Sequence, residues 1–195
     1  MYLYHIIQKY NQIWSIFEIV CFFILLFVLS GILMYYFKQK KIRFTQVVAT
    51  IGLYVFLIFV LEATVFARTS VGKYRYHLLP FWSWAAVLSG KTQYIEQILL
   101  NCILILPVGL FFPFVFNHEI AWKKSLFTGL CISIFIETGQ LILQRGFFEF
   151  DDMIHNSFGC MCGTIVGNWI WRQWKNKKSK KCEDLHEAEQ KSSLV

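Results

Sequence analysis

The chain has 195 residues, of which 56% are hydrophobic and 16% are charged, and its formal net charge is +7 at pH 7. A soluble domain of this length has too little interior to bury so many apolar side chains, so a lipid bilayer must solvate part of the surface. Basic residues gather in two segments beside apolar runs, 38–43 and 172–181. Such clusters are typical of membrane-flanking loops and argue against a nucleic-acid-binding protein.

Five apolar runs follow one another along the chain. They cover residues 13–37, 47–67, 98–116, 125–143 and 153–171. Each is close to the ~20 residues that a helix needs to cross a bilayer. The third contains Pro107 and Pro113, which favour a kinked or shortened helix. The sequence therefore predicts an all-α polytopic integral membrane protein with about five transmembrane helices.

A short aromatic segment, HLLPFWSWAAVL (77–88), precedes the third run. It is too short to span a membrane, and tryptophans are enriched at the level of the lipid headgroups. We expect a re-entrant or interfacial element here. The transmembrane domain should then cover residues 1–174, and residues 175–195 should form a basic, then mixed, cytoplasmic tail.

The distribution of basic residues predicts the orientation of the chain. An odd number of spans places the two termini on opposite sides of the membrane. The segments on the C-terminal side hold thirteen Lys and Arg residues, and those on the other side hold six. Because cytoplasmic loops carry the excess of Lys and Arg, we expect the N-terminus outside and the C-terminus in the cytoplasm.

Polar side chains lie near the outer ends of several predicted spans. Glu137 is six residues from the end of the fourth run, and Gln140 follows it one helical turn later on the same face. Asn101 lies at the outer start of the third run, and Asp152 and Asn156 lie at that of the fifth. Polar groups inside a bilayer usually face a protein interior or a watery cavity. The sequence thus predicts one outward-facing polar pocket.

Small residues follow a separate pattern. Gly159, Gly163 and Gly167 repeat every four residues in the fifth run, a stripe that lets helices pack closely. The six cysteines have no metal-ligand spacing, and five of them lie inside apolar runs. We interpret these as small apolar residues, with no disulfide framework.

Three blocks of the sequence carry a family resemblance. They are HLLPF (77–81), NCILILPVGLFFP (101–113) and SIFIETGQLILQRGFFEFDDMIHNSFGCMCG (133–163). With them, the region of about 75–167 resembles the VanZ-like membrane proteins. The third block matches at Ser133, Glu137, Gln140, Arg145, Asp152, Asn156 and Gly159. His77 replaces the family's usual Asn, and Glu149 stands where the family usually has its first Asp.

The resemblance implies a multi-pass protein of the bacterial plasma membrane. The family is named after a protein associated with low-level resistance to teicoplanin, a lipoglycopeptide, by a route separate from replacing the D-Ala-D-Ala target. The implied partners are the lipid bilayer and either a lipid-linked cell-wall precursor or the lipoglycopeptide itself. Neither the residues nor the resemblance identifies a cofactor, a metal or an oligomeric state.

Three roles fit the polar residues. In the first, the pocket binds or shields a headgroup, and the guanidinium groups of Arg68, Arg75 and Arg145 are suited to bind phosphate. The candidate ligand-binding residues are Arg75, Asn101, Glu137, Gln140, Arg145, Glu149, Asp152 and Asn156.

In the second role, the protein is an intramembrane enzyme that modifies a lipid-linked cell-envelope precursor. Glu137 would be a general base, and Asp152 would hold a hard cation such as Mg²⁺ beside Glu149 or Asp151. No recognised catalytic signature accompanies these residues. In the third role, the polar side chains bond to one another and lock the helices together.

Overall fold

The computed structural model describes residues 16–70 and 72–192. Its elements are α2 (Ile16–Lys38), α3 (Phe44–Leu61), the π-helical turn η1 (Glu62–Phe66), β1 (Tyr76–His77), α4 (Trp82–Leu88), α5 (Gln93–Phe116), α6 (Trp122–Ile142), β2 (Phe148–Glu149) and α7 (Phe150–Ser192). Residues 13–15 of the first predicted run and 193–195 of the predicted tail lie outside the described residues.

The helical polytopic class is confirmed. Within the described residues, four helices are long and apolar enough to cross a membrane: Ile16–Lys38, Phe44–Phe66, Gln93–Phe116 and Trp122–Ile142. The third begins before the predicted residue 98 and runs through both prolines. The fifth predicted run lies in α7, which is not among the four. Many residues of this run are buried by other helices, so its surface need not match the lipid.

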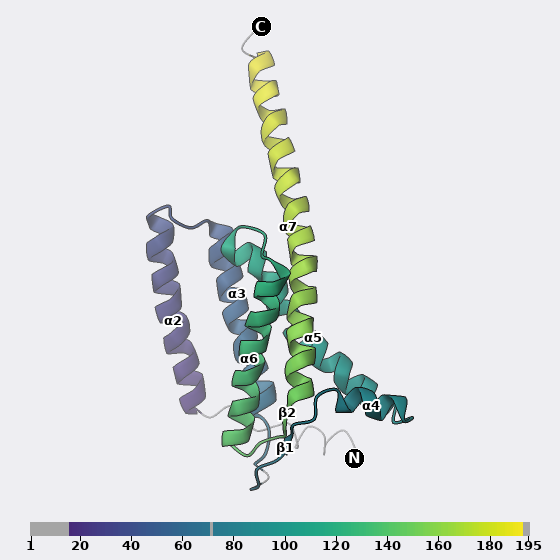
Figure 1. Ribbon diagram of the computed structural model, residues 1–195. Coiled ribbons are helices and arrows are strands. Elements are labelled where there is room, and N and C mark those ends of the chain that lie inside the picture. Colours follow the sequence, from purple (N-terminus) through teal and green to yellow (C-terminus); the bar gives the residue numbers. More distant parts are fainter. Residues whose placement is uncertain (1–15, 71, 193–195) are drawn as a thin grey trace, which may run out of the picture.

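The long helices run between two ends of the molecule (Figure 1). One end, called here the strand end, holds β1, β2 and the N-terminus of α7. The opposite end holds the connections 39–43 and 117–121. The final helix continues past the other helices at that opposite end, and it is helical through most of the predicted tail.

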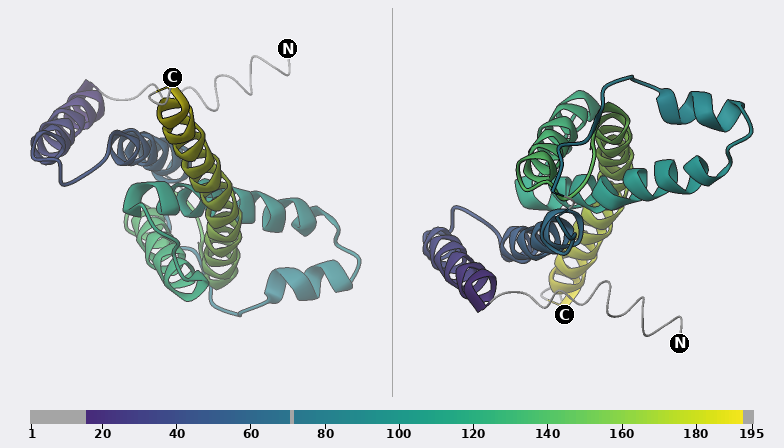
Figure 2. Two further views of the ribbon diagram at one scale, coloured as in Figure 1. Left: turned by 90° about the horizontal axis from the view of Figure 1, so that it is seen from above. Right: turned by 90° about the horizontal axis from the view of Figure 1, so that it is seen from below.

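The first described helix, α2, lies at the edge of the bundle against α3 (Figure 2). None of its residues is buried, which suits a helix whose apolar surface faces lipid on most sides. The Phe22 and Tyr54 rings stack with centroids 5.7 Å apart, and the Tyr54 hydroxyl donates a hydrogen bond to the Phe22 carbonyl.

The most extensive helix contact joins α5 and α7, and the glycine stripe makes it possible. A Cβ atom on Gly159 or Gly163 would overlap the carbonyl oxygen of Cys102 or Leu106, respectively. One on Gly167 would come within 2.7 Å of the Leu110 carbonyl oxygen. The predicted packing role of the stripe is confirmed: these glycines let two backbones touch.

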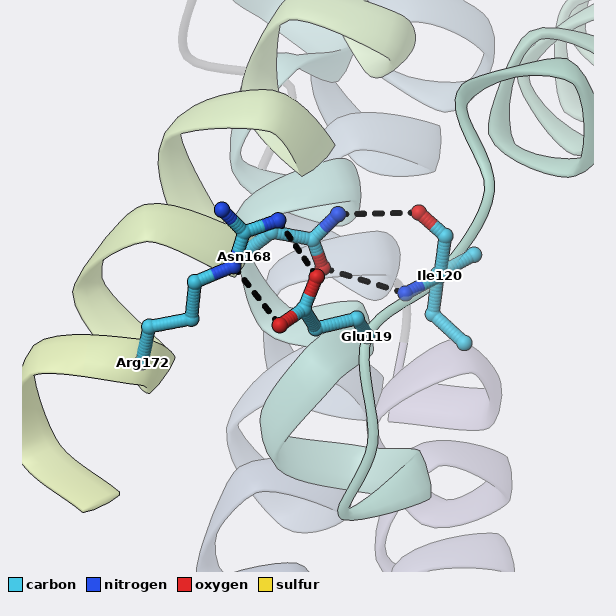
Figure 3. Close-up of polar contacts among 4 residues, drawn as sticks. All are labelled: Glu119, Ile120, Asn168 and Arg172. Carbon is cyan, nitrogen blue, oxygen red and sulfur yellow. Dashed lines mark hydrogen bonds and ion pairs between the residues drawn. The ribbon is translucent and has the colours of Figure 1, made fainter. Parts of the chain in front are cut away.

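A polar clasp fastens the 117–121 connection to α7 at the opposite end (Figure 3). The Asn168 side chain accepts a hydrogen bond from the Ile120 N–H at 3.1 Å and donates one to the Ile120 carbonyl at 2.9 Å. Arg172 donates to both carboxylate oxygens of Glu119, at 2.6 and 2.5 Å. The clasp fixes the point at which α6 starts relative to α7.

At the strand end, the chain makes a contact that the all-α prediction did not include. Strands β1 and β2 pair in parallel, with Tyr76 opposite Phe148 and His77 opposite Glu149. This two-residue pairing joins the segment before α4 to the segment between α6 and α7. The segment predicted as re-entrant or interfacial contains α4, a short helix beside the first turns of α5 (Figure 2).

Candidate functional site

A polar cleft of about 530 Å³ opens at the strand end. It lies between the end of the α3–η1 helix, the first turns of α5, and the β2–α7 junction. Its lining residues are Ala63, Thr64, Arg68, Gln93, Glu96, Gln97, Leu100, Asn101, Leu104, Phe147, Glu149 and Asp152. Three predicted site residues, Asn101, Glu149 and Asp152, therefore share one cleft.

Amide side chains of α5 hold the two carboxylates at the junction. Asn101 donates a hydrogen bond of 2.5 Å from Nδ2 to Oδ1 of Asp152. One helical turn earlier, Gln97 donates from Nε2 to Oε2 of Glu149 at 3.3 Å. Because residues 97 and 101 are four apart, they lie on one face of α5, and they contact β2 and the first turn of α7, respectively.

Glu137 lies behind the cleft, where it is only 1% exposed. Its Oε2 accepts a hydrogen bond of 2.9 Å from the backbone N–H of Glu149. This contact ties α6 to the backbone of β2, whose Glu149 side chain lines the cleft. The geometry gives Glu137 a positioning role, since its carboxylate does not line the cleft.

Gln140 and Asn156 are also buried, and each side chain bonds to another element of the bundle. Gln140 donates from Nε2 to the Thr64 carbonyl at 3.1 Å, in the π-helical turn. Asn156 donates from Nδ2 to the Ser133 hydroxyl at 2.8 Å. Each side chain thus bonds to a neighbouring helix or turn, as the structural role predicts for part of the cluster.

The cation that lines the cleft is Arg68. Arg145 instead donates from Nη1 to the Phe66 carbonyl at 2.7 Å, and the Arg75 guanidinium lies 5.2 Å from the centre of the Phe147 ring. Neither of these predicted anion contacts lines the cleft. Arg68 passes close to Gly146, where an added Cβ would lie 3.1 Å from its Nη1 atom.

Asp151 organises the entrance to α4. Its carboxylate accepts hydrogen bonds from the Phe81 N–H and from the N–H and hydroxyl of Ser83, the last two at Oδ2. These are the orphan donors of a helix start, and a carboxylate is well suited to them. Phe81 has a φ of 62°, a left-handed conformation that costs a non-glycine residue about 1–2 kcal/mol. This role of Asp151 was not predicted, although a serine just after a Pro-Phe turn is typical of a helix start.

The cleft carries an excess of acidic groups. Burial raises the pKa of Glu149 above its ordinary value, while the hydrogen bond from Gln97 and the charge of Arg68 act in the opposite direction. Asp152 and Glu96 add two further carboxylates to the lining. Within residues 16–70 and 72–192, however, no three His, Cys, Asp or Glu side chains converge as metal ligands would.

The fold and the cleft define a helical polytopic membrane protein with a polar site at one end of its bundle. Residues 46–172 match the VanZ/LLP1 family model, and the chain belongs to this family. The matched range contains every residue of the cleft, whereas α2 lies outside it. Searches of curated proteins and of solved structures gave no match.

Proposed function

We propose that the polar cleft binds the headgroup of a lipid or a lipid-linked cell-wall precursor at the outer face of the bacterial plasma membrane. By binding or shielding this material, the protein would lower susceptibility to teicoplanin-type lipoglycopeptides. The observation that carries the proposal is the cleft lining, which combines Arg68, Asn101 and Asp152 with apolar Leu100 and Leu104. A lipid likewise combines a charged or polar headgroup with apolar acyl chains.

The proposed orientation follows from the basic segments. Residues 38–43 and 172–181 belong to the end opposite the cleft, and such segments favour the cytoplasm. The cleft would then face outward, and α7 would complete a fifth crossing. A C-terminal green fluorescent protein fusion should fluoresce, because this reporter folds in the cytoplasm, whereas a C-terminal alkaline phosphatase fusion should be inactive.

The resistance experiment compares the wild type with Asp152→Asn and Asn101→Leu in a teicoplanin-susceptible Gram-positive host. The wild type should raise the teicoplanin concentration needed to stop growth, and both variants should lose most of this effect at equal membrane levels. Each change removes part of a charge-assisted hydrogen bond, which is enough to weaken ligand binding about tenfold. Glu119→Gln, at the opposite end, is the matched control and should protect like the wild type.

Two results would contradict the proposal. One is a wild-type protein that reaches the membrane without changing teicoplanin susceptibility. The other is full protection by both cleft variants. Thermal stability of the purified variants separates a lost ligand contact from a lost fold.

A second candidate, an intramembrane enzyme acting on a lipid-linked precursor, is favoured by one observation. Asp152 and Glu149 are two carboxylates in the same cleft, as acid–base chemistry often requires. Incubation of the purified protein with lipid-linked wall precursors, followed by mass spectrometry, tests this candidate. A new product that Asp152→Asn fails to form would favour the enzyme, and unchanged precursor would favour the binding role.

A further inference from the structure

The lining of the cleft contains more acidic than basic side chains. Its lining contains three carboxylates, Glu96, Glu149 and Asp152, and one guanidinium, Arg68. A bare phosphate would gain attraction from the single cation but repulsion from each of the three carboxyl groups that is ionised. The lining is therefore better matched to a ligand that brings positive charge of its own.

The hydrogen-bonding groups point to the same kind of ligand. The amide donors of Gln97 and Asn101 are already directed to Glu149 and Asp152. Each amide keeps a second N–H, but the amide oxygens and carboxylate oxygens outnumber these donors, so this part of the cleft favours a ligand that supplies N–H or O–H donors. Of the N–H and O–H donors, a cationic N–H group also balances the excess negative charge of the lining.

Arg68 provides a separate place for negative charge. In the described part of the chain, no ion pair within 4.0 Å joins Arg68 to Glu149 or Asp152. Its Nη1 atom lies beside Gly146, 3.1 Å from the place of an added Cβ. Among the described residues, Arg68 and the carboxylates therefore line one cleft without an ion pair of 4.0 Å or less between Arg68 and Glu149 or Asp152.

We infer that the cleft selects a zwitterionic headgroup, with a primary ammonium held by Glu149 and Asp152 and a phosphate held by Arg68. This inference rests on the proposed function and names the ligand class of the same site. Two sources carry this chemistry: an aminated phospholipid of the ethanolamine type, and a lipid-linked wall precursor whose peptide bears a free amine.

A quaternary ammonium fits the same space less well. It has no N–H donor for the carboxylates, and it is normally recognised by aromatic rings around the cation. The aromatic residue in the lining is Phe147, and the Arg75 guanidinium already lies against its ring. The cleft should therefore distinguish an ethanolamine headgroup from a choline headgroup with the same acyl chains.

The test measures binding of lipids to the purified full chain in detergent by native mass spectrometry. Three probes share their acyl chains: phosphatidylethanolamine, phosphatidylcholine and phosphatidylglycerol. Phosphatidylethanolamine should bind about tenfold more tightly than either of the others, since only it offers charge-assisted N–H donors as well as phosphate. A lipid-linked precursor with a free peptide amine, compared with its N-acetylated form, tests the second source.

Protein variants assign the selectivity to the cleft. The double variant Glu149→Gln and Asp152→Asn should lose the preference for ethanolamine over glycerol, whereas Glu119→Gln should retain it. Arg68→Gln should weaken all phosphate-bearing probes. If the double variant does not fold, the comparison of probes on the wild type still decides, because it depends on the lipid chemistry alone.

The outcomes separate this inference from the proposed function. Preference for phosphatidylethanolamine or for the free-amine precursor, lost in the double variant, supports the inference and identifies the source. Phosphatidylglycerol that binds at least as tightly as phosphatidylethanolamine, together with equal binding of both precursor forms, overturns the inference but leaves headgroup binding intact. Failure of every lipid and precursor to bind overturns both proposals.

Discussion

The backbone N–H of Glu149 donates a hydrogen bond of 2.9 Å to the Glu137 carboxylate. This bond connects the buried acidic side chain of α6 to β2, whose Glu149 side chain lines the cleft. A carboxylate within an apolar helix is costly unless it has partners. Here the backbone of β2 supplies one, so removing the Glu137 side chain should disturb the cleft indirectly.

Glu137→Leu should leave the Glu149 N–H without its acceptor, at a cost of about 1–3 kcal/mol. For a chain of this size, we expect the melting temperature in detergent to fall by roughly 2–4 °C per kcal/mol. Glu137→Gln keeps a side-chain oxygen at the same position and should retain most of the stability and protection. Equal melting temperatures for the two variants would contradict the positioning role.

Asp151 should hold α4 in place. Asp151→Ala removes the acceptor for the Phe81 and Ser83 donors, and loss of a helix cap typically costs about 0.5–2 kcal/mol. Hydrogen exchange of the α4 amides, residues 82–88, should therefore accelerate, while exchange in the centre of α6 stays unchanged. Ser83→Ala removes only the hydroxyl and should have a smaller effect. Unchanged exchange in Asp151→Ala would show that other contacts dock α4.

The α5–α7 contact should depend on the absence of a side chain at Gly163. In Gly163→Ala, the added Cβ would overlap the Leu106 carbonyl oxygen, so the helices must separate, at about 1–3 kcal/mol. We expect a lower melting temperature and reduced membrane levels. Gly31→Ala is the matched control, since its Cβ would meet nothing within 4 Å and alanine favours a helix by about 1 kcal/mol. A Gly163→Ala protein as stable as Gly31→Ala would contradict this account.

Much of the fold follows from patterns that are local in the sequence. Apolar runs of the right length predict the helices, because lipid imposes one requirement on every span. The positions of Glu137, Asn101 and Asp152 in their predicted spans place these polar groups near one end. In the structure Asn101 bonds to Asp152, and Glu137 bonds to Glu149, three residues before Asp152. The glycine repeat likewise predicts close packing, because it depends only on helical periodicity.

The remaining features depend on how loops turn, which periodicity does not describe. Of Arg68, Arg75 and Arg145, Arg68 lines the cleft, and the pattern of apolar runs does not distinguish among the three. The pairing of His77 with Glu149 joins residues far apart in the chain. The length of α7 could have been predicted from the sequence, because its C-terminal end is rich in Lys, Glu and Gln, which are strong helix formers.

Glu149 should make the stability of the purified, ligand-free protein depend on pH. Its folded-state pKa is raised mainly by burial, so the folded protein binds the proton more tightly than the unfolded chain does. The resulting stabilisation is fully present below the unfolded pKa of about 4.3 and is lost as pH rises through the folded pKa. Glu149→Gln removes this titration and should melt at a higher temperature than the wild type at pH 7.5.

Glu119 provides the comparison, because its pKa is shifted the other way. The hydrogen bond from Arg172 lowers the pKa of Glu119, so its contribution is present above the unfolded pKa and is lost as pH falls through the folded pKa. Melting curves of the wild type, Glu149→Gln and Glu119→Gln between pH 4 and 8 test both signs. The difference between Glu149→Gln and the wild type should grow toward neutral pH, and the deficit of Glu119→Gln should shrink toward acid pH. A Glu149→Gln protein less stable than the wild type at pH 7.5 would show that the ionised carboxylate stabilises the ligand-free cleft, contrary to the expected effect of its burial.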